Sequence, residues 1–62
     1  MQLPHNPFIL LSFVNTQLRD NFLNLDDFCI SFQTSYGYLS EKIAPLGYEY
    51  NADKNQFVYT KQ

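Results

Sequence analysis

The stretch NPFILLSFVNTQLRD, residues Asn6–Asp20, carries the strongest helix pattern in the chain. Asn6 is able to accept a hydrogen bond from a first-turn N–H, and Pro7 suits the first helical position, where its missing N–H costs nothing. Apolar residues then recur at spacings of three and four, which puts them on one face of a helix. These residues are Leu10, Leu11, Val14, Leu18 and Phe22. The pattern predicts a core-facing helix from about Pro7 to Asn21 or Phe22.

The same helix has two further faces. A polar row borders the apolar stripe, and it consists of Ser12, Asn15 and Arg19. Ile9 and Phe13 share the far face with Thr16 and Asp20, and they form a second, smaller apolar patch. We expect either the C-terminal segment or a partner to cover that patch.

Chain length sets the size of the core. The chain has 62 residues, which is enough for one domain over residues 1–62. Such a chain buries only about 60% of the surface that its unfolded form exposes, so its stability is marginal. Aromatic residues make up 18% of the sequence and add large buried areas. Self-association is a common further remedy for so small a core.

Charge and cysteine content exclude several classes of protein. The net charge is −2, with only four Lys and Arg residues, which disfavours binding to the phosphates of a nucleic acid. The single cysteine excludes an intrachain disulfide and fits a reducing compartment. The apolar run 8–14 is too short to cross a bilayer and does not resemble a signal peptide. We therefore expect a soluble, cytoplasmic protein with no membrane association.

Two more helices are predicted after the first. Asn24 is a candidate N-cap, and Asp26 and Asp27 suit the first turn that follows. The apolar face of this second helix comprises Leu25, Phe28, Cys29 and Phe32. Thr34 or Ser35 is expected to cap a third helix. Its predicted inner face comprises Tyr36, Leu39, Ile43 and Leu46, and its predicted outer face comprises Tyr38, Glu41 and Lys42.

The C-terminal part changes to a period of two, which is typical of strands. Tyr48–Tyr50 and Gln56–Tyr59 read as two strands joined by the turn-rich connector 51–55. Met1–His5 is expected to form an extended arm, and Thr60–Gln62 a frayed end. The predicted fold class is thus α+β, mostly α: three short helices followed by a C-terminal two-stranded β-hairpin, in the order of a miniature winged helix.

Several pieces of the sequence together match a known pattern. They are Asn6-Pro7 with Leu10-Leu11-Ser12, Val14-Asn15-Thr16 through Leu18-Arg19-Asp20, Leu25-Asp26 with Cys29, Gly47-Tyr48 with Tyr50-Asn51, and Asn55-Gln56-Phe57. In their order and spacing, the chain resembles a family of short bacterial proteins catalogued as a domain of unknown function, number 4250. It departs from that pattern at Gly37 and Pro45, which leaves the regularity of the third helix open. Pro45 is expected to disrupt or tighten the last turn of this helix, and Gly47 to end it. The resemblance implies a small bacterial protein and no particular activity.

The favoured functional hypothesis is a protein–protein interaction module or adaptor. Its candidate surface comprises Ile9, Ser12, Phe13, Asn15 and Arg19, because interfaces favour aromatic residues and Arg. A structural interpretation competes with it. Arg19 would pair with an acid, and Asn15 would bond to the backbone of the hairpin, so that both tie the hairpin to the first helix. Asn55 and Gln56 face the same choice between a structural role and a binding surface, and turn chemistry is the default interpretation for Asn55.

The alternative hypothesis is a winged-helix-like nucleic-acid binder. Its third helix would present Tyr38 and Lys42, and the loop of the hairpin would add Lys54. The nearby acidic residues argue against it because they offset the positive charge. These are Glu41, Glu49 and Asp53.

An enzyme is not expected, and neither is a cofactor or a metal. Asp26 and Asp27 are adjacent on a helix and point about 100° apart, so they fit capping better than a catalytic pair. Cys29 lies on an apolar face and His5 is the only histidine. No spacing of metal ligands arises from one His and one Cys.

Overall fold

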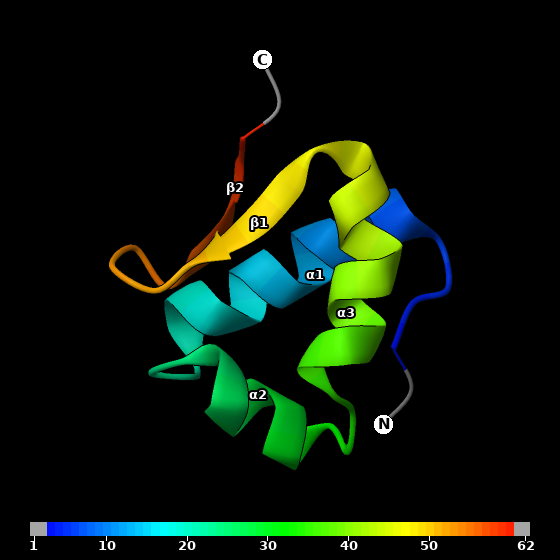
Figure 1. Ribbon diagram of the computed structural model, residues 1–62. Helices are drawn as coiled ribbons and strands as arrows, with labels where there is room; N and C mark the ends of the chain where they lie inside the picture. Colours follow the sequence, from blue (N-terminus) through cyan, green and yellow to red (C-terminus); the bar gives the residue numbers. More distant parts are fainter. Residues whose placement is uncertain (1–2, 61–62) are drawn as a thin grey trace.

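The structure is a computed structural model that describes residues 3–60. Its elements are α1 (Pro7–Asp20), α2 (Leu25–Ser31), α3 (Tyr36–Ile43), the 3₁₀ turn η1 (Ala44–Leu46), β1 (Tyr48–Asn51) and β2 (Gln56–Tyr59) (Figure 1). The predicted class, three helices followed by a two-stranded antiparallel hairpin, is confirmed. Parts of the expected arm and frayed end, at residues 1, 2, 61 and 62, lie outside the described residues.

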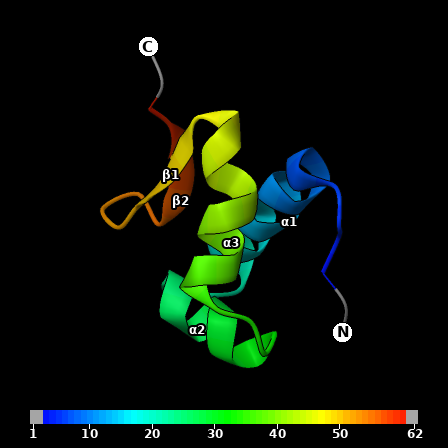
Figure 2. The same cartoon turned by 45° about the vertical axis from the view of Figure 1, so that its right-hand side comes forward.

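The helix α1 occupies the centre of the arrangement. The hairpin crosses one side of it, α2 lies on the opposite side, and α3 packs across both helices (Figures 1 and 2). The core sits where the inner face of α1 meets these elements. Its buried members are Leu10, Leu11, Val14, Leu18, Leu25, Phe28, Cys29, Leu39, Ile43 and Phe57.

Side-chain caps fix the start of each helix, as the sequence predicts. Oδ1 of Asn6 accepts from the N–H groups of Phe8 and Ile9 at 2.9 and 3.2 Å. Asn24 caps α2 through the N–H of Asp27 at 2.8 Å. Ser35, rather than Thr34, caps α3. Each cap satisfies N–H groups that the helix itself leaves unpaired, so the three starts are encoded locally.

The third helix is regular at Gly37, and its end tightens at Pro45 and stops at Gly47 as the sequence predicts. Gly37 lies inside an uninterrupted α-helix. Pro45 falls in η1, where the chain tightens before Gly47 takes up a left-handed conformation with φ of 91°. The placement of Tyr36 on the inner face is wrong, because its side chain is 53% exposed. It occupies the first position of α3, beside a hollow lined by residues of α2 and the hairpin.

The aromatic side chains between α1 and α2 form one cluster. Phe28 is fully buried and stacks on Phe32 with ring centroids 4.6 Å apart. Phe13 meets the Phe32 ring edge-on at 5.5 Å, and Phe22 meets Phe28 at 5.6 Å. The sequence pattern placed Phe13 on the outer face of α1. In the structure its ring instead packs partly against α2. Its position borders the apolar stripe, and a long ring can turn from that border towards a neighbouring helix.

The hairpin pairs Tyr48 with Tyr59 and Tyr50 with Phe57. Phe57 is only 3% exposed, and its side chain packs in the core and anchors the hairpin there. An isolated hairpin would be unstable in water, so this packing on α1 is what keeps the two strands together.

Cys29 should react slowly with a thiol reagent such as iodoacetamide while the protein is folded. Burial, and then the negative charge of Asp26, raise the pKa of the Cys29 thiol, and the thiolate is the reactive form. Because deprotonation is disfavoured in the folded state, stability should fall as the pH rises past about 8.5, the ordinary thiol pKa. Mass spectrometry of timed samples, with and without denaturant, measures the rates. Equal rates of alkylation with and without denaturant would contradict the burial of Cys29 in the folded protein.

Candidate functional site

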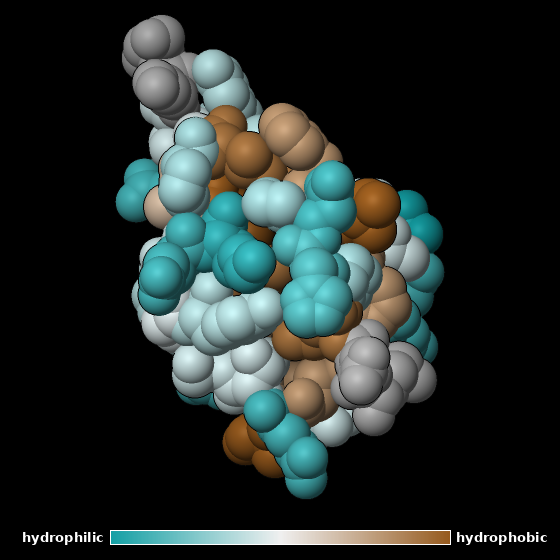
Figure 3. Space-filling view, turned by 90° about the vertical axis from the view of Figure 1, so that its right-hand side faces the viewer, coloured by the Kyte–Doolittle hydropathy of each residue, from teal (hydrophilic) through white to brown (hydrophobic). Residues whose placement is uncertain are grey.

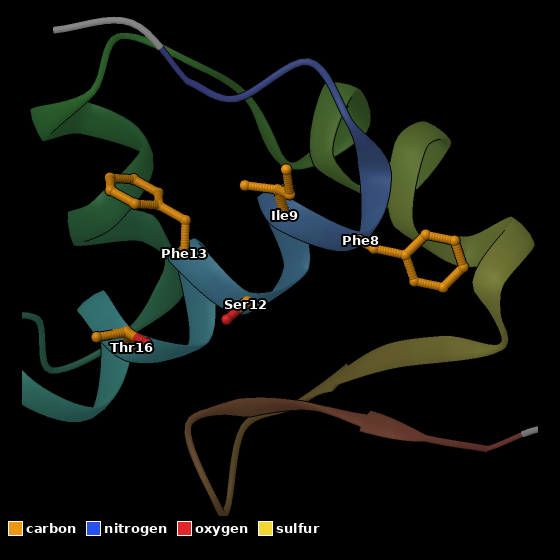
Figure 4. A pocket seen from close by; sticks show the side chains of 5 residues that line it. All are labelled: Phe8, Ile9, Ser12, Phe13 and Thr16. Atoms are coloured by element: carbon orange, nitrogen blue, oxygen red, sulfur yellow. The ribbon is translucent and has the colours of Figure 1, made fainter.

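The outer face of α1 carries a shallow, open groove of about 420 Å³. Its lining residues are Phe8, Ile9, Ser12, Phe13 and Thr16. Figure 4 shows Ser12 in the middle of this set, with Phe8 towards η1 at one end and Phe13 turned towards α2 at the other. Phe8 is 67% exposed and Ile9 is 59% exposed. Two large apolar side chains therefore stand in solvent beside the small side chains Ser12 and Thr16.

Helix periodicity explains why this face is left open. Leu10, Val14 and Leu18 turn to the core, which places Ser12 and Thr16 roughly opposite them at about 100° per residue. Ile9 belongs to the same outward side. The sequence leaves open whether the C-terminal segment or a partner covers this patch. Within residues 3–60 the C-terminal segment does not cover it, because β2 packs on the side of α1 that carries Asn15.

Asn15 is a structural residue, in agreement with the competing interpretation. Its Nδ2 donates to the carbonyl of Phe57 at 3.0 Å, and its Oδ1 accepts from the N–H of Phe57 at 2.7 Å. The side chain thus pairs with β2 much as a third strand would. Because both ends of the amide are occupied, Asn15 belongs to the contact between helix and hairpin rather than to an exposed surface.

Arg19 pairs with an acid on its own helix, not with the hairpin. Its Nε and Nη2 donate to the two carboxylate oxygens of Asp20 at 2.9 and 3.0 Å. Hydrogen bonding to Asp20 raises the pKa of Arg19, and hydrogen bonding to Arg19 lowers the pKa of Asp20. Both side chains are exposed, so the pair contributes little to stability. It does neutralise the two charges at the end of α1.

The candidate surface predicted from the sequence is therefore divided. Ile9 and Ser12 line the groove, Phe13 forms one end of it, Asn15 faces the hairpin, and Arg19 lies beyond the lining. Sequence reasoning missed Phe8. Its position one turn before Ser12, on a face without core partners, was the available signal.

Asn55, in the loop of the hairpin, makes a polar network that extends beyond the turn chemistry expected of it. Asn55 has a positive φ of 53°, and its Nδ2 donates to the carbonyls of Leu18 and Phe22 at 3.0 and 2.9 Å. Its Oδ1 accepts from the Tyr50 hydroxyl at 2.7 Å, and that hydroxyl accepts from the N–H of Leu25 at 3.2 Å. Asn55 thus closes the end of α1 in addition to shaping its own turn.

The residues of the nucleic-acid alternative do not form one basic face. Lys42 donates to the carbonyl of His5, just before α1, and lies 6.0 Å from the centre of the Tyr38 ring. Lys54 precedes Asn55, which bonds to the far end of α1. A helix of 14 residues is about 21 Å long, so these two cations sit at opposite ends of it.

Figure 3 views the molecule from the side of α3, where hydrophobic side chains appear only as separate spots among hydrophilic ones.

A second hollow, of about 330 Å³, lies where α2, α3 and the hairpin meet. Asp26 is the one carboxylate in its lining, so it offers no pair of carboxylates for acid–base chemistry. Over residues 3–60, no three His, Cys, Asp or Glu side chains gather in a way that would hold a metal ion. None of the helices in this part of the chain is long and apolar enough to cross a bilayer.

Comparison with known proteins gives one match. The family model named domain of unknown function (DUF4250) matches residues 4–57, which is most of the chain, and the chain therefore belongs to this family. No curated protein and no solved structure matches it. Several residues that carry the resemblance meet in the contact between α1 and the hairpin; they are Asn15, Leu18, Tyr50, Asn55 and Phe57.

Proposed function

We propose that this member of the DUF4250 family is a small, non-enzymatic protein-interaction module, or adaptor, that binds a protein partner with the outer face of α1. The supporting observation is the exposure of Phe8 and Ile9 beside the groove over Ser12 and Thr16. Single exposed apolar residues are ordinary, whereas neighbouring ones that border a hollow are typical of interaction sites.

The chemistry of the groove favours a protein as the ligand. Its lining offers two hydroxyl groups and otherwise apolar and aromatic surface, and it holds no ionisable side chain. Full burial of a Phe or Ile side chain contributes about 1.5–3 kcal/mol. Burial of Phe8 and Ile9 by a partner would thus supply a substantial part of the free energy of association. It would help to offset the translational freedom that the two molecules lose on binding. We further propose a cytoplasmic location for the protein, which the single free thiol of Cys29 supports.

A site-specific photocrosslink tests this proposal. A photoreactive phenylalanine analogue placed at Phe8 should capture a protein in the source cells, because that ring would lie inside the interface. The matched control carries the same analogue at Leu23, which is apolar and 87% exposed but lies in the connection between α1 and α2. Capture that is no stronger at position 8 than at position 23 would contradict the proposed surface.

The nucleic-acid alternative predicts a different result in the same cells. Nucleic acid would be recovered with the protein at low salt and lost at high salt, because phosphate contacts weaken steeply with ionic strength. Replacing Lys42 and Lys54 by Gln would then abolish the recovery. We expect neither result, since the two cations are far apart and the net charge is −2.

A further inference from the structure

We infer that the occupant of the α1 groove is a second copy of this chain. In this pair, α1 would pack antiparallel on the α1 of the other copy about a two-fold axis that passes close to Ser12. The inference rests on the proposed function, because it names the partner for the same surface. It follows from the charge, the shape and the size of that surface.

The charge distribution on α1 permits two like-charged molecules to meet there. The stretch 6–18 contains no charged side chain, although the chain as a whole has a net charge of −2. The two charges that α1 does carry, on Arg19 and Asp20, neutralise each other. The remaining acids lie on other elements: Asp26, Asp27, Glu41, Glu49 and Asp53. A face without charge offers nothing to a strongly basic or acidic partner, and it imposes no repulsion on an identical one.

The shape of the groove is self-complementary. A two-fold interface brings the same surface of both copies together, so that surface must supply both the protruding side chain and the space that receives it. Phe8 protrudes four residues before Ser12, and the small Thr16 follows four residues after it. With the axis at Ser12, Phe8 of each copy meets Thr16 of the other. Ser12 itself is small, which lets the two helices approach closely where they cross.

The size of the surface sets the expected strength. A standard interface buries about 800 Å² on each partner, which is about a fifth of the 4310 Å² that this chain exposes. The groove itself exposes only a small part of that area, so the interface would have to extend onto the side chains that flank it. We therefore expect a reversible dimer whose population depends on protein concentration rather than an obligate one.

Cysteine crosslinking tests the geometry of the pair. The variant Ser12→Cys should form a covalent dimer on mild oxidation, because the axis brings the two sulfur atoms face to face and disulfides need Cα atoms within about 4.4–6.8 Å. Leu23→Cys, at another exposed site, should give little crosslink. The native chain, whose Cys29 is buried, should give none.

Sedimentation equilibrium of the full chain tests the stoichiometry. The native chain should shift from monomer to dimer as concentration rises a hundredfold, while Ile9→Asp should remain a monomer over that range. Because Ile9 is exposed, the circular dichroism of this variant should match that of the native chain.

A native chain that stays monomeric, or an Ile9→Asp variant that still dimerises, would overturn the inference. So would a failure of Ser12→Cys to crosslink more than Leu23→Cys. The photocrosslink at position 8 then distinguishes the second copy of this chain from a different protein partner, through the mass of the captured adduct. An adduct with a different protein keeps the proposed function and excludes the second copy, whereas the absence of any adduct removes both.

Discussion

Replacing Phe28 by alanine should reduce the free energy of unfolding by roughly 3–5 kcal/mol, the usual cost of deleting a buried phenylalanine. Phe28 is fully buried and has three aromatic neighbours, namely Phe13, Phe22 and Phe32. A chain of 62 residues has a total stability of about 3–9 kcal/mol at 0.05–0.15 kcal/mol per residue. We therefore expect Phe28→Ala to lose a large part of the total stability of the chain and to unfold at a much lower urea concentration.

Urea unfolding followed by circular dichroism measures this effect. Phe28→Leu keeps most of the volume and should cost clearly less, so it provides a folded variant from which the trend can be read. Leu23→Ala truncates an apolar side chain at an exposed site and should change stability by less than about 0.5 kcal/mol. If Phe28→Ala unfolds at the same urea concentration as the native chain, the aromatic cluster is not the core of this protein.

Replacing Asn55 by alanine should reduce the free energy of unfolding by about 2–4 kcal/mol. The change removes two bonds to the carbonyls of Leu18 and Phe22 and one to the Tyr50 hydroxyl, and each buried polar group left unpaired costs about 1–3 kcal/mol. Alanine is also strained at the positive φ of this residue. Both effects act in the same direction. The midpoint of urea unfolding again provides the measurement.

Glycine substitutions separate these two causes. Asn55→Gly relieves the backbone strain but still loses all three bonds, so it should remain strongly destabilised. Gln33 supplies the matched control, because it has nearly the same φ, 54°, and an exposed side chain. Gln33→Gly should be neutral or should stabilise the protein by up to about 1 kcal/mol. Similar effects of Gly at both positions would show that the network around Asn55 contributes little.

The sequence predicted those features that short-range chemistry determines. Asn6, Asn24 and Ser35 cap helices through N–H groups two or three residues away, so each start is legible without the rest of the fold. The alternation in 56–59 places Phe57 and Tyr59 on the side of the strand that faces the helices; Phe57 does enter the core, whereas Tyr59 is 61% exposed. The end of α1 was less predictable. The N–H groups of Asn21 and Phe22 both reach the carbonyl of Gln17, and this double contact ends the helix earlier than the apolar pattern suggests.

The candidate site was only partly predictable because it depends on which neighbours α1 acquires. Periodicity placed Ile9 and Phe13 together on the outer face, but the position of α2 drew the Phe13 ring away. Asn15 and Arg19 looked equivalent as members of one polar row. In the structure, Asn15 bonds to Phe57, 42 residues further along the chain, whereas Arg19 bonds to its immediate neighbour Asp20. A partner that lies 42 residues away leaves no local trace in the sequence.

The network around Asn55 also bears on how the polypeptide is made at the ribosome. The last turn of α1, the first N–H of α2 and the side chain of Asn15 all find their partners in residues 50–57. A growing chain that stops before this segment leaves those groups unpaired and lacks the Phe57 side chain that completes the core. Stable early intermediates are therefore disfavoured, and the nascent helices remain open to proteases and chaperones until β2 emerges. Synthesis of a single short strand then converts the whole chain to the folded state.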